Sequence, residues 1–524
     1  MSRARPSESR GSRHAGAAAR PRSAAPADAG PGAGAVASLL TAMLVAAFLV
    51  RIALQASRAV FYTDECFHAH AAQWIAGHHR LPGVMPELYS GFYYYYPPLL
   101  HVLGAIWIAL LGQGALPFLN VGFTALLLAA LWIGLPARPK SRARLWAVLL
   151  CLSSNAVGFH SVRFYVEALL ALVTLGAVVL LLRFWSTRRM RDAALLGGAV
   201  GLALLTKQTA LLMLPALAAL ALLCAARRQG PRAAGLAAAL GVALLVALPM
   251  FLRNQLLFGD PIYPLLASDL DRTLYDMNRH HFAIPPADFY RESLAAAGPA
   301  VVAAGILTLV LAAVRRRATL EALLTAAIAL AFGAAPRAPL ADPRHLYPLI
   351  PPLALLGAGA LSAAIGARRR MAIAVWIVLF GAAGFAVVRM PDHRRDLDVP
   401  VFLAEAYAAI QSKVPEGETV LSLWTYDTFY YSRRNATWPI PWGQRVHFTG
   451  LFRERDPARF LATLDSTGID CMLVPRWEPS DEFDGVNYPK SFLDCADSLW
   501  ARGRLRRLWQ SDLLILLARV PRHE

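Results

Sequence analysis

Two adjacent carboxylates, Asp64 and Glu65, follow the first long apolar run of the sequence. A carboxylate at a membrane surface is suited to general-base chemistry, in which it takes the proton of an acceptor hydroxyl. The same two residues also suit the first turn of a helix beginning at Thr63 or Asp64, because acidic side chains stabilise the positive end of a helix. The two interpretations are compatible, and both stay open.

Isolated cations stand where later apolar runs meet the same predicted surface. They are Arg163, Lys207, Arg253 and Arg344, the last followed by His345. Several cations around one pocket would hold a lipid phosphate through charge-assisted hydrogen bonds and stabilise it as a leaving group. The alternative is single cations that extend to the lipid headgroups. Glu167, four residues after Arg163, could pair with it or line the same pocket.

Histidines and tyrosines lie close to the acidic pair. His68 stands four residues after Asp64, so a helix would place both on one face, a geometry that a divalent metal could use. No tight set of three ligands accompanies them, and we favour a helix with scattered imidazoles. The tyrosine run that ends at Tyr96, before Pro97 and Pro98, is typical of a bilayer interface and would also suit a sugar ring.

The composition of the 524 residues indicates a membrane protein. Hydrophobic residues make up 57% and charged residues only 16%, with a mean hydropathy of +0.44. The net charge of +18 could suggest nucleic acid as a partner, but the cations cluster between apolar runs, as they do in proteins that use charge to set membrane orientation. About 11 apolar runs are long enough to be membrane spans. They begin near positions 35, 115, 145, 167, 192, 208, 233, 298, 319, 346 and 371.

A twelfth apolar segment, residues 98–112, is short and begins at a Pro pair. If it does not cross, six predicted cytoplasmic segments together carry 23 Lys and Arg residues, whereas the short outer loops carry few. If it crosses, every later cluster changes sides and the positive-inside rule fails along the chain. We therefore expect an interfacial or re-entrant helix in the first outer loop.

The charge pattern divides the chain into three parts. Residues 1–34 are predicted to be a disordered basic cytoplasmic tail, 35–390 an all-α polytopic membrane domain, and 391–524 a small extracytoplasmic α/β domain. Strand-like and helix-like runs alternate in the last part. The expected strands are Thr419–Trp424, Cys471–Pro475 and Leu513–Val520, and the expected helices Asp456–Ser466 and Ser491–Arg502.

The order of these motifs resembles the C-type fold of polyprenyl-phosphate-sugar glycosyltransferases. The acidic pair after the first span is followed by an aromatic stretch that ends in Pro-Pro-Leu. Later motifs agree, namely Arg163-Phe-Tyr-Val-Glu167, Thr206-Lys207-Gln208-Thr209, Arg253-Asn254 before Gly259–Pro264, and Arg344-His-Leu-Tyr-Pro348. The sequence is most similar to the bacterial relatives of protein O-mannosyltransferases and of the lipid A aminoarabinose transferase, over about residues 35–390.

This resemblance implies site residues at the matching positions. Asp64 would be the catalytic base, and Glu65 would support it or bind sugar. The expected donor-phosphate ligands are Lys207, Arg344, His345 and Arg253, and the expected substrate pocket contains Tyr96, His101, Arg163 and Glu167. Tyr96 stands where the aminoarabinose enzyme has a Lys, so a phosphate contact there would come from another residue, such as His101. Some relatives use a divalent metal and others do not, so no metal site and no cofactor are assigned.

We therefore expect a glycosyltransferase, transferring a hexose or pentose, at the outer face of a bacterial inner membrane. It would move the sugar from a polyprenyl-phosphate donor to a hydroxyl of a lipid, glycan or protein, with inversion and with Asp64 as base. The alternative is a transporter or lipid flippase without covalent chemistry. Such proteins usually carry ionisable residues and broken helices near the membrane midplane, whereas the polar residues here collect on one face.

Overall fold

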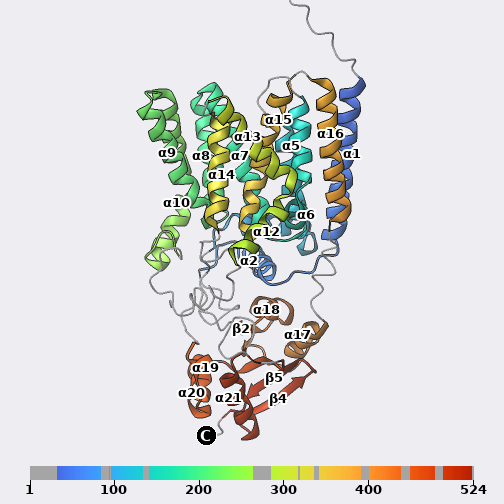
Figure 1. Ribbon diagram of the computed structural model, residues 1–524. Coiled ribbons are helices and arrows are strands. Elements are labelled where there is room, and N and C mark those ends of the chain that lie inside the picture. Colours follow the sequence, from blue (N-terminus) through green and yellow to red (C-terminus); the bar gives the residue numbers. More distant parts are fainter. Residues whose placement is uncertain are drawn as a thin grey trace, which may run out of the picture.

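The computed structural model describes residues 32–83, 94, 96–133, 141–263, 285–316, 319–335, 342–366, 368–390, 401–437, 449–477, 479 and 488–521. The predicted disordered tail lies outside the described residues as far as position 31, and so does the predicted domain boundary at 391. Figure 1 shows that the described parts form a bundle of long helices at one end of the molecule and a small sheet with its own helices at the other.

The bundle contains a helix for each of the eleven predicted apolar segments. These helices are α1 (Gly32–Ala56), α4 (Phe118–Ile133), α5 (Ser141–Leu152), α7 (Val166–Thr187), α8 (Met190–Leu204), α9 (Met213–Ala226), α10 (Gly230–Phe258), α13 (Pro299–Val314), α14 (Leu320–Ala334), α15 (Ile350–Ile365) and α16 (Arg369–Arg389). Of the described helical segments, six are long and apolar enough to cross a membrane, or up to eight if two bent helix pairs each form one span. The protein is thus a multi-pass membrane protein, and the number of eleven crossings stays a prediction.

The outer helices of the bundle present apolar side chains that are exposed among the described residues. Leu222 on α9 is 71% exposed, Leu330 on α14 is 74% exposed and Val378 on α16 is 66% exposed. In contrast, α5 and α15 are buried along most of their length and form the centre of the bundle. An exposed apolar surface around a protein core is what contact with lipid requires.

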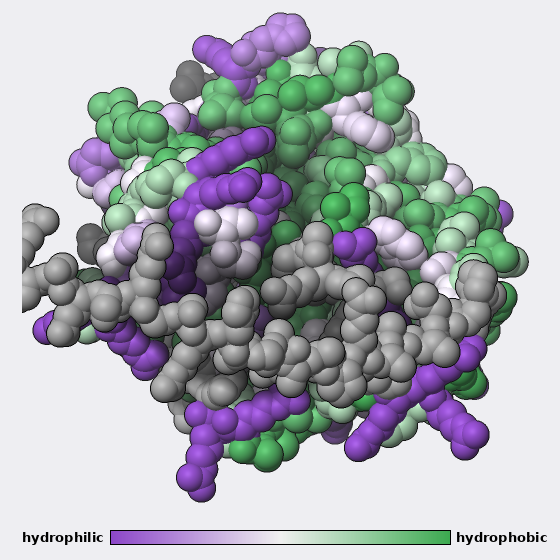
Figure 2. Space-filling view, turned by 90° about the horizontal axis from the view of Figure 1, so that it is seen from above, coloured by the Kyte–Doolittle hydropathy of each residue, from purple (hydrophilic) through white to green (hydrophobic). Residues whose placement is uncertain are grey.

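Charge differs between the two ends of the bundle. The turns between α7 and α8, α9 and α10, α13 and α14, and α15 and α16 lie at the end of the bundle where α1 begins (Figure 1). They carry Arg188, Arg227, Arg315 and Arg368. Hydrophilic side chains gather at this end among apolar ones (Figure 2). The sheet lies beyond the opposite end, which also carries three short helices. These are α2 (Asp64–His78), α6 (Asn155–Val162) and α12 (Pro286–Ala297).

The segment predicted to be an interfacial helix forms α3 (Leu99–Leu111), which packs along α2. The amide of Leu99 donates to the carbonyl of Leu205 over 2.8 Å, at the lower end of α8. A Cβ atom added to Gly104 would lie 2.9 Å from the Cβ atom of Ala72 on α2, so the close packing of the two helices requires glycine there. These contacts fix both helices at the same end of the bundle.

The sheet has five strands in the order β2-β1-β3-β5-β4. They are β1 (Thr419–Leu421), β2 (Asn435–Thr437), β3 (Cys471–Pro475), β4 (Leu505–Gln510) and β5 (Leu514–Arg519). β1 pairs in parallel with β2 and β3, whereas β5 pairs antiparallel with β3 and β4. The predicted strand Cys471–Pro475 is confirmed, and the other two predicted strands are shorter than expected. The edge strands β2 and β4 were not predicted, because β2 has only three residues and β4 carries polar and largely exposed residues, so neither has a continuous apolar pattern.

Five helices accompany the sheet, namely α17 (Val401–Lys413), α18 (Thr425–Ser432), α19 (Thr449–Arg453), α20 (Pro457–Thr467) and α21 (Lys490–Ala501). α20 and α21 correspond to the two predicted helices. Phe460, Phe492 and Leu517 belong to a buried cluster between these helices and the sheet. α18 lies on the side of the sheet that faces the bundle, close to α2 (Figure 1).

Candidate active site

The acidic pair lies in the first turn of α2, where the chain has just left α1. Thr63 occupies the N-cap position with φ 51° and ψ −121°, and its side chain makes no capping hydrogen bond. A positive φ at a β-branched residue costs on the order of 1–3 kcal/mol and persists only where the surroundings impose it. The predicted helix start is therefore confirmed, but the Thr63 hydroxyl does not cap it.

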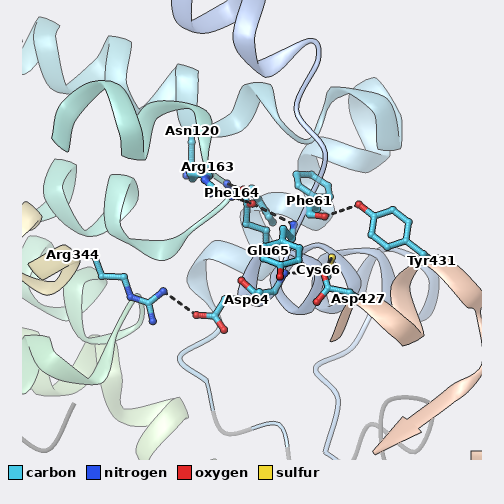
Figure 3. A network of polar contacts seen from close by, with 12 residues as sticks. Phe61, Asp64, Glu65, Cys66, Asn120, Arg163, Phe164, Arg344, Asp427 and Tyr431 are labelled. Carbon is cyan, nitrogen blue, oxygen red and sulfur yellow. Dashed lines mark hydrogen bonds and ion pairs between the residues drawn. The ribbon is translucent and has the colours of Figure 1, made fainter. Parts of the chain in front are cut away.

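Glu65 is buried, and both oxygens of its carboxylate have protein partners. Its Oε2 atom lies 2.6 Å from Nη1 of Arg163 and accepts the amide of Tyr62 over 3.3 Å, and its Oε1 atom accepts the amide of Phe164 over 2.7 Å. The Glu65 side chain is only 1% exposed. Both carboxylate oxygens thus bind protein groups, so Glu65 anchors the start of α2 to the segment between α6 and α7 (Figure 3). Its expected role beside the base stays a prediction.

Asp64 points to the other side of the helix start, toward Arg344 (Figure 3). Its Oδ2 atom lies 3.0 Å from Nη1 of Arg344, and each of the two side chains is 32% exposed. Arg344 also forms a 2.9 Å ion pair with Asp342 and lies 5.5 Å from the ring centre of Tyr165. Asp64 is therefore a reachable carboxylate with a cation beside it, which is the arrangement that general-base chemistry next to a phosphate requires.

A further ion pair joins Lys207 to Glu167. Nζ of Lys207 lies 2.6 Å from Oε1 of Glu167, and both side chains are largely buried. Glu167 interacts electrostatically with Arg344 as well as with Lys207. Arg163 and Arg344 both lie against the ring of Tyr165, at 5.8 and 5.5 Å. Ion pairs from four parts of the sequence thus meet at the same end of the bundle.

Arg163 does not form the ion pair with Glu167 that the sequence offered as one alternative. Arg163 binds Glu65 and not Glu167, which binds Lys207 instead. The amide of Asn120 on α4 also fixes this segment, because its Nδ2 group donates to the carbonyl oxygens of Arg163 and Tyr165. Arg163 therefore joins this segment to the start of α2 through Glu65, and its place in a substrate pocket stays a prediction.

The structure places Arg253 at the edge of the first outer loop and not among the ion pairs. Its Nη2 group donates to the carbonyls of Pro82 and Tyr94 over 2.6 and 2.7 Å. Its position shows that it holds the loop to the lower end of α10. For His345 the backbone amide donates to the carbonyl of Asp342 over 3.0 Å.

His101 is fully buried, and both of its ring nitrogens have partners. Nε2 lies 2.7 Å from Nδ1 of His68, and Nδ1 contacts the hydroxyl of Tyr94. Neither ring nitrogen is therefore free in this conformation for the phosphate contact suggested for His101, and that contact stays a prediction. Burial also lowers the pKa of His68 to about 4, which keeps its imidazole neutral. Tyr96 lies against His68 and Phe67, with ring centres 5.2 and 5.1 Å apart.

Sequence reasoning missed the part of the site that comes from the sheet domain. Asp427, on α18, accepts the amide of Thr63 through Oδ1 over 2.9 Å and lies 3.5 Å from Sγ of Cys66. It is 1% exposed, and burial raises its pKa to about 7. No local pattern around Asp427 signals this contact, since its partner is 364 residues away. Within the described residues, no three His, Cys, Asp or Glu side chains are grouped to hold a metal ion.

Comparisons with known proteins identify the fold of the chain. A family model described as dolichyl-phosphate-mannose-protein mannosyltransferase matches residues 96–252. ArnT from Cupriavidus metallidurans bound to undecaprenyl phosphate is similar in structure, with 16% identity and a TM-score of 0.61 over 94% of this chain and 99% of that chain. The protein has the fold of the C-type glycosyltransferases.

Two further structures share this C-type fold. The oligosaccharyltransferase of Archaeoglobus fulgidus in complex with Zn and sulfate is 14% identical, with a TM-score of 0.62 over 86% of this chain and 70% of that chain. AglB from the same organism, in complex with an inhibitory peptide and a dolichol-phosphate, is 12% identical, with a TM-score of 0.61 over 86% and 72%. No curated protein sequence matches the chain significantly. The family match contains Arg163, Glu167 and Lys207, but neither Asp64 nor Arg344.

Proposed function

We propose that this protein is a glycosyltransferase that moves a sugar from a polyprenyl-phosphate donor to an acceptor hydroxyl. The observation that carries the proposal is the 3.0 Å pair of Asp64 and Arg344, because it places an accessible carboxylate beside a cation at the end of the bundle that carries few basic turns. That end is the outer face of a bacterial inner membrane in this proposal. The N-terminus is then cytoplasmic, and residues 391–524 form a domain in the periplasm or outside the cell.

The chemistry follows from the charges that meet at this end. Asp64 accepts the proton of the acceptor hydroxyl, whose oxygen attacks the anomeric carbon from the face opposite the phosphate. The new carbon–oxygen bond forms as the bond to the phosphate oxygen breaks, so the configuration inverts and the polyprenyl phosphate leaves with the electron pair. Arg344 and Lys207 stabilise the charge that develops on this leaving group.

Support for the lipid donor comes from the related structures. ArnT was solved with undecaprenyl phosphate and AglB with a dolichol-phosphate, and both lipids have a single phosphate. In the present structure Arg344 and Lys207 are each paired with a carboxylate. A bound phosphate would therefore take over part of these cation contacts, which leaves the Asp64 carboxylate free to accept a proton.

The test compares wild-type protein with Asp64→Asn, which keeps the size of the side chain but removes the base. Both are purified in full length and assayed for release of undecaprenyl phosphate from a panel of undecaprenyl-phosphate-linked hexoses and pentoses, with a bacterial envelope extract as acceptor. We expect the variant to retain binding of undecaprenyl phosphate and to lose transfer by about 1,000-fold or more. Wild-type transfer by folded Asp64→Asn protein would show that the base is another group.

A further inference from the structure

The sheet domain contacts the proposed active site through α18. This helix packs along α2 by ring contacts, including Phe67 with Tyr426 at 5.3 Å and His70 with Phe429 at 4.4 Å between ring centres. The hydroxyl of Tyr431 donates to the carbonyl of Phe61 over 2.5 Å, just before α2 begins. The interface is therefore mostly aromatic, and none of these contacts requires a charged group.

Asp427 is the exception in this aromatic interface. It is the only charged residue of α18, and it is almost completely buried. Burying a carboxylate is unfavourable unless protein donors replace the lost water. Its donors are the Thr63 amide at 2.9 Å and the Cys66 thiol at 3.5 Å, which lie on either side of the acidic pair in the sequence. Figure 3 shows Asp427 approaching the start of α2 from the side opposite Arg344.

The backbone amide of Thr63 has its hydrogen-bond acceptor in Asp427. Thr63 has a positive φ, and its conformation directs the amide away from the first turn of α2 and toward Asp427. The carbonyl of the same residue accepts the amides of Cys66 and Phe67, which closes that turn. The orientation of Thr63 therefore determines where Asp64, the next residue, points its side chain.

We propose that Asp427 is a positioning residue for the reaction, which holds the Thr63 backbone so that Asp64 points at the reacting hydroxyl. The sheet domain is thus a structural part of the active site and not a separate appendage. This inference rests on the proposed function of Asp64 as base. Asp427 itself does not contact the substrate in this proposal.

The first experiment measures amide hydrogen exchange in the full-length protein in detergent. Asp427→Ala removes the acceptor, and we expect exchange in residues 63–67 to become about 10-fold faster or more. Asp427→Asn retains an acceptor oxygen and should keep exchange close to wild type. Asp465→Ala, which removes an exposed ion pair with Arg519 elsewhere in the sheet domain, is the matched control and should leave residues 63–67 unchanged. Wild-type exchange in Asp427→Ala would overturn the proposal.

The second experiment measures transfer with the same panel of undecaprenyl-phosphate-linked sugars. We expect Asp427→Ala to lower kcat by about 10- to 100-fold with little change in KM, because misplacing a base affects the chemical step and not donor binding. Asp427→Asn should restore most of the loss. Tyr431→Phe removes the hydroxyl that bonds to the carbonyl of Phe61 and to Cys66. It is the milder variant if Asp427→Ala does not fold, and should lower kcat by a few-fold.

The outcomes separate the two proposals. If Asp64→Asn inactivates the protein but Asp427→Ala and Tyr431→Phe keep the wild-type kcat, the positioning by α18 is wrong and the base assignment stands. If Asp64→Asn is as active as wild type, the base assignment falls, and the positioning of that base falls with it. A loss of kcat in Asp427→Ala that Asp427→Asn does not restore would also overturn the proposal.

Discussion

Oδ2 of Asp64 lies 3.0 Å from Nη1 of Arg344, although the two residues are 280 positions apart in the sequence. Asp64 comes from the start of α2, and Arg344 from the 3-10 helix Pro343–Leu349 that precedes α15. The proposed base and the cation proposed for the leaving group are thus delivered by opposite ends of the membrane part of the chain. Their contact depends on the whole bundle being assembled.

Replacing Arg344 should therefore affect the chemical step. We expect Arg344→Ala to lower kcat/KM for transfer by about 100-fold or more, because removal of one positioned donor from a developing negative charge costs two to three orders of magnitude. Arg344→Lys keeps the charge but loses the second nitrogen, so it should be intermediate. Arg291→Ala, which removes an exposed Arg paired with Asp288, is the control. Activity of Arg344→Ala equal to that of the control would contradict the prediction.

The pair of Glu65 and Arg163 should matter mainly for stability. Glu65→Gln leaves the buried guanidinium of Arg163 without its counter-ion, which typically costs about 3–5 kcal/mol in the free energy of unfolding. The double variant Glu65→Gln with Arg163→Met removes both charges and should recover part of that loss. Thermal unfolding in detergent measures both effects. Equal Tm values for wild type and Glu65→Gln would mean that the pair contributes no stability.

Replacing Lys207 and replacing Glu167 should have different effects on the binding of the lipid donor. Lys207→Ala removes a cation and should weaken binding of undecaprenyl phosphate by about 10-fold, the usual effect of one charge-assisted hydrogen bond. Glu167→Gln removes a negative charge from the same place and frees the ammonium group, so it should bind the lipid at least as tightly as wild type. Titration with undecaprenyl phosphate alone measures both. If both variants bound the lipid equally weakly, the pair would contribute to folding and not to phosphate binding.

The buried carboxyl of Asp427 gives the stability a defined pH dependence. Its pKa is raised to about 7 in the folded protein from an ordinary value of 3.8, so between these pH values the folded state holds a proton that the unfolded state has lost. Its contribution is fully present below about pH 4 and is lost as the pH rises to 7, by on the order of 1 kcal/mol per pH unit. The carboxyl faces Tyr62, Asp64, Cys66, Tyr407 and Tyr431.

We expect Asp427→Asn to remove this slope, since asparagine does not titrate and the other facing groups are unchanged. The measurement is the difference in Tm between wild type and Asp427→Asn from pH 4 to 8. Relative to the Tm of wild type, the Tm of Asp427→Asn should increase as the pH rises. A constant difference would show that the carboxyl keeps one protonation state over the whole range.

The orientation can be tested by labelling single cysteines in intact cells. All five native cysteines are buried, so their background reaction should be low. Ser186 ends α7 at the basic end of the bundle, and Ser466 lies on α20 in the sheet domain; both are exposed. We expect a membrane-impermeant maleimide to label Ser466→Cys and not Ser186→Cys. Labelling of Ser186→Cys from outside would reverse the orientation.

The gathering of the site residues at one end of the bundle was the part of the site that the sequence could predict. Charge on the turns indicates which ends of the helices lie together, so Asp64, Arg163, Lys207 and Arg344 could be placed at one end without coordinates.

 In the structure, Arg344 and Asp64 are in direct contact.

The choice of ion-pair partners could not be predicted. The four-residue spacing of Arg163 and Glu167 suggests a pair only if the segment is helical. In the structure Arg163 and Tyr165 have extended backbones, and α7 begins only at Val166. Arg163 is therefore free to pair with Glu65, which reaches it from α2. The contact of Asp427 was beyond prediction for a related reason, since it depends on how α18 docks and not on any local pattern.

The position of β5 has a consequence for biosynthesis. Among the described strands it is the last in chain order, yet it lies inside the sheet, between β3 and β4. The sheet therefore cannot close until the ribosome has added residues 514–519, long after the start of α2 has been made. Until then α18 lacks a complete sheet behind it. If α18 positions Asp64 as proposed, the site becomes competent only after β5 has been inserted between β3 and β4.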